Sequence, residues 1–119
     1  MEKFSVKSKD GEYFIDTNSI ICLKANGSYT DIYTQVKDTG KFIKHTQSGN
    51  LRKYEKRLKA CPWFCRISRW FIINLRYLQF KGRDNCIILT IKCVESLNLT
   101  KSYKARYKEA MSNMQPPLK

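Results

Sequence analysis

The side chains that most often carry out chemistry are few in this sequence, and they are scattered. The single histidine, His45, lies in a polar alternating stretch (41–46), so a Ser/His/Asp or Cys/His arrangement would depend on it alone. The acidic residues form no close pair of the kind used in metal-ion phosphodiester cleavage. The sequence also contains no glycine-rich phosphate loop. We therefore expect a protein that is not an enzyme and has neither a cofactor nor a small-molecule substrate.

Five cysteines could bind a metal or form disulfides, but their number and spacing argue against both. They are odd in number, and the first ten residues contain no apolar segment typical of a secretory signal, so reduced thiols in a cytoplasmic protein are expected. Cys61 and Cys65 are four residues apart, yet a zinc site would need two further well-spaced ligands. No apolar run approaches the ~18–20 residues of a membrane span. We predict no metal site and no membrane partner.

Positive charge is the strongest compositional signal. Lys and Arg number 23 against 10 Asp and Glu, a net charge of +13. The excess is concentrated in residues 41–83, which contain 12 basic residues and 1 acidic residue. A surface that is merely soluble would mix the two signs along the chain. This concentration favours a nucleic-acid partner over a solvated basic face.

The apolar and turn patterns predict many short strands and little helix. Asp10-Gly11 separates two segments (4–8 and 12–16) that read as a hairpin. Alternation of β-branched and aromatic residues predicts a half-buried strand over 28–36. Further strands are expected over 19–25, 41–46, 64–67, 70–75, 77–81, 86–93 and 96–100. A helix over 51–60, capped by Asn50, and a second over 103–111 complete a mostly β fold.

Several conspicuous residues have structural interpretations. The helical stripes Leu51/Tyr54/Leu58 and Tyr103/Tyr107/Met111 are expected in the core. Asn74 interrupts an apolar run, which is best explained by an amide that bonds nearby backbone. Arg66 is interpreted as a structural residue that forms an intramolecular ion pair. Trp63 and Trp70 are expected to pack in the core or at its rim.

Four stretches, in order, resemble the LytTR DNA-binding domain. They are an apolar strand, turn and second strand over 20–34, a short helix over 49–58, Phe-Cys-Arg-Ile-Ser-Arg-Trp-Phe-Ile-Ile-Asn-Leu over 64–75, and Leu-Thr-Lys-Ser-Tyr-Lys over 99–104. The third resembles the family signature F-x-R-I-H-R-S-Y-x-V-N, with Ser68 and Trp70 replacing His and Ser. The resemblance covers roughly residues 5–112. We predict one such domain over 4–112 and a loose tail over 113–119.

The resemblance implies an elongated, mostly β domain of short antiparallel strands in small sheets, with one or two short helices. Such domains bind duplex DNA through loops in successive major grooves. The chain would act as a transcriptional regulator or as the DNA-binding output domain of one. Because one small domain offers modest contact area, two copies on tandem half-sites are expected.

Specific DNA binding needs residues that read bases and residues that hold phosphates. The loop positions Tyr29, Arg69 and Lys101 are predicted to contact bases. Arg69 is the strongest candidate, because its guanidinium can bond guanine O6 and N7 together. Residues predicted to contact the DNA backbone are Lys24, Asn26, Ser28, Ser68, Arg76, Ser102, Lys104 and Arg106.

Two other kinds of partner stay open. A basic β domain with many aromatic residues could bind RNA or single strands by stacking, which would require solvent-facing aromatics gathered on one sheet face. It could also dock on an acidic protein. Tyr29 itself could be a residue that only packs on the face of a sheet.

Overall fold

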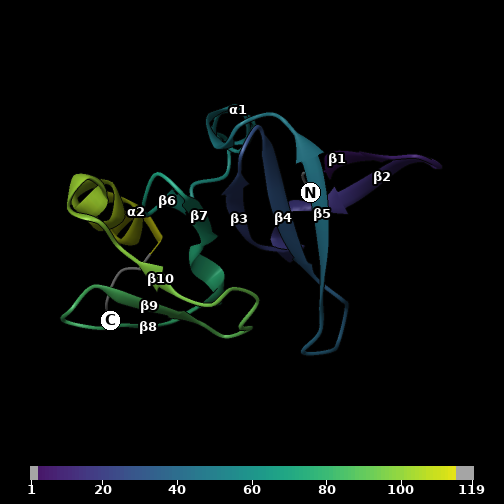
Figure 1. Cartoon of the computed structure of the whole chain (residues 1–119). Helices are drawn as coiled ribbons and strands as arrows, with labels where there is room; N and C mark the ends of the chain where they lie inside the picture. Colours follow the sequence, from purple (N-terminus) through teal and green to yellow (C-terminus); the bar gives the residue numbers. More distant parts are fainter. Residues whose placement is uncertain (1–2, 115–119) are drawn as a thin grey trace.

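The computed structural model describes residues 3–114, which form ten short strands, two α-helices and three single-turn 3₁₀ helices (Figure 1). The strands are β1 (Lys3–Ser8), β2 (Gly11–Asp16), β3 (Ile20–Asn26), β4 (Tyr29–Gln35), β5 (Phe42–Ser48), β6 (Phe64–Arg66), β7 (Phe71–Asn74), β8 (Leu78–Lys81), β9 (Cys86–Leu89) and β10 (Leu97–Asn98). The helices are α1 (Leu51–Arg57) and α2 (Lys104–Met114), and the 3₁₀ turns are η1 (Thr17–Ser19), η2 (Leu75–Tyr77) and η3 (Lys101–Tyr103). Within residues 3–114, no helix is long and apolar enough to cross a membrane.

All strand pairs are antiparallel and fall into three small sheets. The central sheet has the order β5-β4-β3-β7-β6, the β1–β2 hairpin stands apart, and a three-stranded sheet has the order β10-β9-β8. The described chain measures 46 × 33 × 26 Å along its principal axes. The predicted mostly β class, with short antiparallel strands in small sheets and two short helices, is therefore confirmed, whereas the domain is compact rather than elongated.

The central sheet is covered on both faces, which explains the unbroken apolar run that opens β3. Ile20 and Leu23 pack with the first strand and α1, through Phe4, Val6, Leu51, Tyr54 and Leu58. Ile21 and Cys22 pack in a second core with β9, β10 and the inner side of α2. A strand buried on both faces has no solvent side on which polar residues could alternate.

Local predictions about side chains are confirmed at two asparagines. The Asn50 side chain caps α1 by accepting a hydrogen bond from the Lys53 amide at 3.0 Å. Asn74 is fully buried; its amide donates to the Ile20 carbonyl at 2.9 Å, and its side-chain oxygen accepts from the Arg76 amide at 2.9 Å. Both residues satisfy backbone groups that would otherwise lack partners.

The structure corrects four predicted boundaries or burials. The first helix ends at Arg57 rather than at residue 60. The strand predicted over 86–93 ends at Leu89, which pairs with Leu78, the first residue of the partner strand β8; one further bond, from the Thr90 amide to the Tyr77 carbonyl at 2.7 Å, follows this pair. The stripe Tyr103/Tyr107/Met111 is half-buried, since α2 lies at the edge of its core. That helix continues to Met114, so the predicted tail loses 113–114, and 115–119 lie outside the described residues.

Candidate nucleic-acid interface

Backbone hydrogen bonds bring three loops together at one end of the central sheet. The β6–β7 loop (residues 67–70) is the centre of this arrangement. Its Trp70 carbonyl accepts from the Ala25 amide at 2.8 Å, beside the β3–β4 turn, and its Ile67 carbonyl accepts from the Thr100 amide at 2.9 Å, beside η3. These loops carry the three predicted base readers, Tyr29, Arg69 and Lys101. They therefore belong to one region of the molecule.

Arg66, the last residue of β6, holds the β6–β7 loop by hydrogen bonds to its main chain. Its Nε donates to the Ser68 carbonyl at 3.1 Å and its Nη2 to the Arg69 carbonyl at 3.0 Å. Its Nη1 pairs with Glu55 Oε1 at 3.0 Å, and only 14% of its side chain is exposed. The rigid guanidinium fork suits such simultaneous contacts. The intramolecular role predicted for Arg66 is confirmed.

Glu55 joins three elements behind the loops. From α1, it reaches Arg66 on β6 with one carboxylate oxygen and Arg106 on α2 with the other, at 3.1 Å. Arg106 is 57% exposed at its side chain and also lies 4.9 Å above the ring of Tyr103. A predicted phosphate contact therefore already has a protein partner, although much of its side chain still faces solvent.

The side chains of the three predicted base readers are exposed to solvent and make no hydrogen bond or ion pair in the described chain. Tyr29 is 51% exposed, and Arg69 and Lys101 are also exposed. Within residues 3–114, none of the three uses its side chain in a hydrogen bond or an ion pair. The Arg69 guanidinium lies 5.1 Å from the ring centroid of Trp70, which is itself 56% exposed. Their polar groups are thus available to an external partner.

Five of the predicted backbone contacts lie on or next to the three loops. Lys24 is exposed on β3, opposite Asp31 and Phe71. The Asn26 amide donates to the Asp31 carboxylate at 3.3 Å, and the Ser28 carbonyl accepts from the Gly49 amide at 3.0 Å. Ser102 and Lys104 are exposed on and just after η3. They surround the base-reading candidates as phosphate contacts would need to.

Two other predicted contacts are placed differently. Ser68 is buried, and its hydroxyl accepts a hydrogen bond from the Trp70 amide at 3.1 Å, which shapes the loop from inside. Arg76 follows β7 at the opposite end of the central sheet. There it donates to Asn18 Oδ1 at 2.7 Å and stacks on Trp63 at 4.2 Å. The structure does not bring Arg76 together with the three loops.

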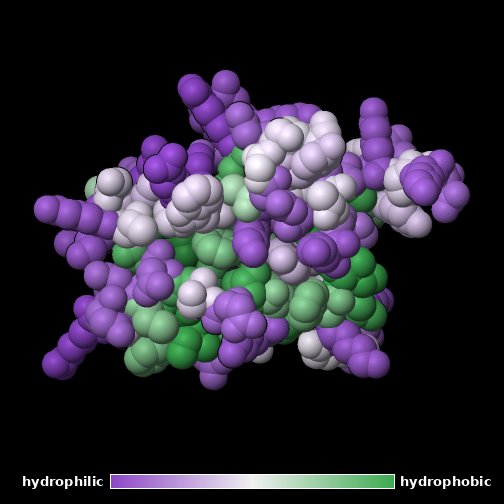
Figure 2. Space-filling model, in the orientation of Figure 1, coloured by the Kyte–Doolittle hydropathy of each residue, from purple (hydrophilic) through white to green (hydrophobic). Residues whose placement is uncertain are grey.

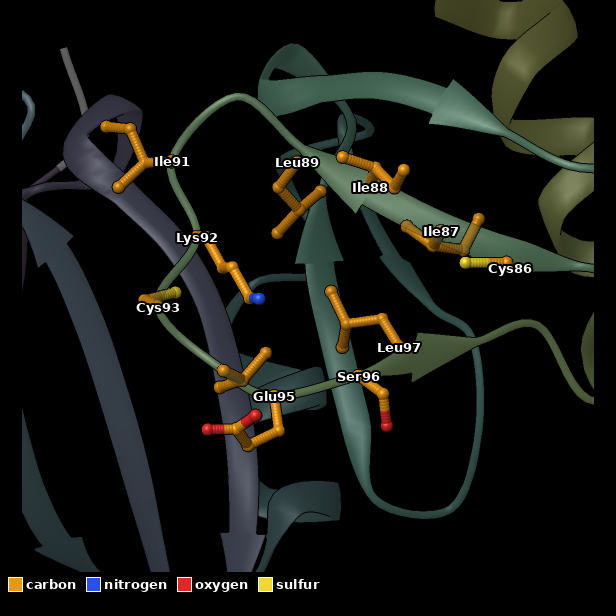
Figure 3. A pocket seen from close by; sticks show the side chains of 11 residues that line it. Cys86, Ile87, Ile88, Leu89, Ile91, Lys92, Cys93, Glu95, Ser96 and Leu97 are labelled. Carbon is orange, nitrogen blue, oxygen red and sulfur yellow. The ribbon is translucent and has the colours of Figure 1, made fainter.

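The surface near the loops is hydrophilic, whereas apolar surface gathers elsewhere. In the view of Figure 2, hydrophilic side chains cover the upper edge over α1 and the neighbouring strand ends, and hydrophobic residues concentrate in the lower half. An apolar cavity of about 230 Å³ lies in the three-stranded sheet (Figure 3). There the segment after β9 arches back to β10 around Leu89 and Leu97.

The cysteines lie in the lining of this cavity and in the core. Within the described chain no cysteine forms a disulfide, and no group of three or more His, Cys, Asp or Glu residues could hold a metal ion. Cys93 lines the cavity, and its Sγ lies 3.4 Å from Cys22 Sγ. This hydrogen bond raises the pKa of the buried Cys22 thiol and lowers that of Cys93. Both thiols lie outside the three loops.

Comparison with known proteins identifies the family. The family model of the LytTr DNA-binding domain matches residues 10–112. The chain belongs to this family. The domain is thus a DNA-binding domain of a class used in transcription regulation, as the resemblance predicted.

A solved structure and the curated proteins complete the comparison of this LytTR domain. The structure of the LytTr DNA-binding domain of a Bacillus cereus protein, described as a methyl-accepting/DNA response regulator, matches with a TM-score of 0.66 at 18% identity. The match covers 93% of this chain and 97% of that chain, and it shows a shared fold. Comparison with the curated proteins found no match.

Sequence reasoning did not identify every residue that builds the interface. Glu55 was not singled out, yet it bridges two arginines behind the loops. Gly49 was not singled out either. Its amide donates to the Ser28 carbonyl in the β3–β4 turn at 3.0 Å, and its carbonyl accepts from the Thr30 hydroxyl on β4 at 2.9 Å. The lone acidic residue within the basic stretch 41–83 was a signal for Glu55, because a single carboxylate among twelve cations is well placed to pair.

Proposed function

We propose that this LytTR domain binds double-stranded DNA sequence-specifically by placing the β3–β4 turn, the β6–β7 loop and η3 in the major groove. The observation that carries the proposal is the pair of backbone hydrogen bonds from Ala25 to Trp70 and from Thr100 to Ile67. They hold three exposed loops of a strongly basic domain side by side. The family match supports a binding role rather than a catalytic one.

Arg69 is the principal base reader in this mechanism. Its side chain is exposed and unbonded, while its main chain is fixed by the Arg66 guanidinium. An arginine held in this way can donate two hydrogen bonds to guanine O6 and N7, worth about 1–3 kcal/mol of discrimination. Tyr29 contacts a thymine methyl group or a phosphate, and Lys101 donates to a base edge.

Phosphate contacts position these readers and give most of the affinity. Lys24, Asn26, Ser28, Ser102 and Lys104 flank the loops, and Arg106 keeps an exposed guanidinium. Each neutralised phosphate releases counterions, so binding weakens steeply with salt. Ser68 is buried, so it supports the loop from inside and does not itself contact a phosphate. Arg76 reaches the DNA backbone only if the duplex curves past the opposite end of the sheet.

The proposed assembly is two copies on tandem half-sites, acting on transcription in the cytoplasm. The described chain is 46 Å long, and a single domain of this size contacts a limited stretch of duplex. A second copy doubles the number of readers and raises specificity.

Binding to RNA or to single strands is the second candidate, and the exposed rings of Trp70 and Tyr29 favour it. Both rings lie beside the three loops and could stack on unpaired bases. Other exposed aromatics, Tyr13, Phe14 and Phe42, lie on β2 and β5 rather than beside them. The exposed aromatic rings are therefore spread over several strands and do not form one stacking surface beside the three loops.

Selection of bound duplexes from a random pool tests the function. The wild-type domain is expected to return a defined motif, to prefer duplex over single strands, and to show a log–log salt slope of several units, since each phosphate contact contributes about 0.9. Arg69→Ala should relax the choice at one base position by about 1–3 kcal/mol. Lys104→Ala is the matched control, because loss of a phosphate contact weakens all duplexes about equally.

The outcomes separate the two candidates. An unchanged motif in the Arg69→Ala domain would show that Arg69 reads no base. A preference for single strands over duplex, with a flat motif, would replace the proposed function by the stacking alternative. A nearly flat salt slope would contradict phosphate binding altogether.

A further inference from the structure

A basic groove lies between β1, β5 and α1, outside the three loops. It has a volume of about 610 Å³. Its floor and rims are polar and include the Gln47 amide and the end of β5 at Ser48. Three cations line it from two elements, namely Lys7 on β1 and Lys53 and Arg57 on α1.

The groove keeps a net positive charge, because its lining includes three cations and only one carboxylate lies at its margin. No acidic residue lines it. The one carboxylate of α1, Glu55, is bound on the other side of the helix by Arg66 and Arg106. Glu12 on β2 contacts the Ser5 hydroxyl at the margin, and it is set against three cations. The lining therefore keeps a net positive charge.

The walls of the groove are fixed by hydrogen bonds. The Gln47 side chain accepts from the Lys7 amide at 2.7 Å and donates to the Lys7 carbonyl at 2.8 Å, which ties β1 to β5. Arg57 donates to the Ser5 carbonyl at 3.1 Å and lies 3.9 Å over the ring of Phe4. The Tyr54 hydroxyl donates to the Ser48 carbonyl at 2.6 Å. A ligand would meet a preformed surface.

The two lysines, by contrast, are not held. Neither Lys7 nor Lys53 uses its ammonium group in an ion pair or hydrogen bond within residues 3–114, and Lys53 Nζ lies 5.4 Å from the centroid of the Tyr54 ring. Both are exposed. Two exposed ammonium groups, each on a flexible four-carbon side chain, suit a repeating anion better than one compact ligand, because each group can pair with a different phosphate.

The groove is continuous with the proposed interface. The Lys53 side chain lies across Gly49, close enough that a Cβ atom at residue 49 would come within 2.7 Å of its Cδ. Gly49 in turn donates to the Ser28 carbonyl of the β3–β4 turn. A duplex seated on that turn therefore passes the mouth of the groove.

We propose that this groove binds the sugar-phosphate backbone of the same DNA duplex, through Lys7, Lys53 and Arg57, beside the bases contacted by the three loops. The inference rests on the proposed function and extends its footprint to α1 and to the N-terminal hairpin. It also gives a role to part of the basic run over 41–83 that the loops leave unused. The groove contributes affinity and orientation and reads no base.

Charge-neutral substitutions test the proposal on the full chain. A Lys7→Gln/Lys53→Gln domain should bind the selected duplex roughly tenfold more weakly near physiological salt, and its log–log salt slope should fall by about 2, one unit for each lost phosphate contact. The selected motif should stay the same. Arg57 is left intact because it stacks on Phe4 and supports β1.

The matched control is Lys37→Gln/Lys41→Gln. These two lysines are exposed around the β4–β5 turn, at the other end of the same sheet, so the net charge changes equally. The control domain should keep the wild-type affinity within about twofold and nearly the full slope. Thermal unfolding of both variants should match that of the wild type, which separates a lost contact from misfolding.

Ethylation interference locates the contact and separates this inference from the proposed function. In wild type, modified phosphates flanking the motif should block binding, and that block should vanish in the Lys7/Lys53 variant while interference within the motif persists. If the variant and its control bind alike, with the same slope and interference pattern, the groove proposal is overturned and the loops remain the binding site. If the wild-type domain selects no duplex motif, the proposed function itself is contradicted, and the groove proposal that rests on it is contradicted with it.

Discussion

The β4–β5 turn and the β6–β7 loop lie at opposite ends of the central sheet, and they are held in different ways. The β4–β5 turn is closed by its own residues: Val36 bonds Lys41 at 2.9 Å, Thr39 bonds Val36 at 3.1 Å, and Asp38 has a positive φ of 60°. The β6–β7 loop is held by Ala25, Thr100 and Arg66, two of which are distant in sequence. The first is a local turn, whereas the second is a place where the tertiary structure converges.

This difference teaches where precision in this LytTR domain originates. A self-contained turn can move without disturbing the rest of the fold. A loop fixed from three sides presents its side chains in one arrangement, which a base-reading arginine requires because misplacement forfeits its two hydrogen bonds. Substitutions at the two ends of the sheet should therefore differ in their effects on stability and on DNA affinity.

Removal of Arg66 should have the largest effect. Arg66→Met deletes two hydrogen bonds to loop carbonyls and one to Glu55, and charge-assisted bonds of this kind are worth about 1.5–3 kcal/mol each before solvent exposure is considered. Because Glu55 keeps Arg106, we expect a net loss of about 2–3 kcal/mol in the free energy of unfolding. Chemical denaturation measures it, and DNA affinity should fall for every sequence.

Arg83→Met is the control for this change, because Arg83 is an exposed arginine in the β8–β9 turn. It should alter stability by less than about 0.5 kcal/mol. Equal effects of the two substitutions would mean that the carbonyl contacts of Arg66 do not hold the loop.

Two glycines give the next comparison. Gly49 has a φ of +110° and lies under Lys53, so Gly49→Ala should cost about 1–3 kcal/mol in strain and displace that lysine. Gly40, in the β4–β5 turn, has open space around its Cα, and Gly40→Ala should be neutral or stabilising by about 0.4–1 kcal/mol. Thermal unfolding of both variants checks the difference. If the Gly49→Ala domain were as stable as wild type, the close packing of Lys53 on Gly49 would not constrain this region next to the β3–β4 turn.

The smallest effect concerns β5, which connects the two ends. Burial lowers the pKa of His45 below its usual 6.5, and its Nε2 lies 3.3 Å from the Thr34 hydroxyl. The folded state therefore binds this proton less readily than the unfolded state. The contribution is present above pH 6.5 and is lost as the pH falls through the lowered value. A His45→Gln domain should show a flatter decline in unfolding free energy between about pH 7.5 and 5.5; an unchanged decline would assign it to other groups.

The sequence predicted most elements because their signals are local. The β4 strand, the Asp10-Gly11 turn and the Asn50 cap depend on neighbouring residues, and each is present in the structure. The alternation over β4 predicted a half-buried strand, which is wrong: residues 30–34 are all buried, because both faces of the central sheet are covered. The end of β9 at Leu89 depends on where its partner strand β8 begins, at Leu78, which no alternation pattern within residues 86–93 records. The half-buried stripe of α2 reflects the position of that helix at the edge of the core.

The candidate site was predicted by resemblance more than by pattern. Loop positions such as Arg69 follow from the family signature, but their convergence depends on main-chain groups of Ala25 and Thr100. Any residue type supplies those groups, so the side-chain sequence carries no trace of them. The groove at Lys7 and Lys53 was not foreseen for the same reason, since β1 and α1 meet only in the folded chain.

The attachment of the β6–β7 loop through carbonyls and amides has an evolutionary consequence. Because Arg66, Ala25 and Thr100 hold only the peptide groups of the loop, the amino acid at residue 69 can be exchanged without rebuilding its support. Under the proposed function, in which residue 69 reads a base, new operators would become accessible by single codon changes at that site. A library varied at residue 69 alone should accordingly yield stable regulators with altered targets.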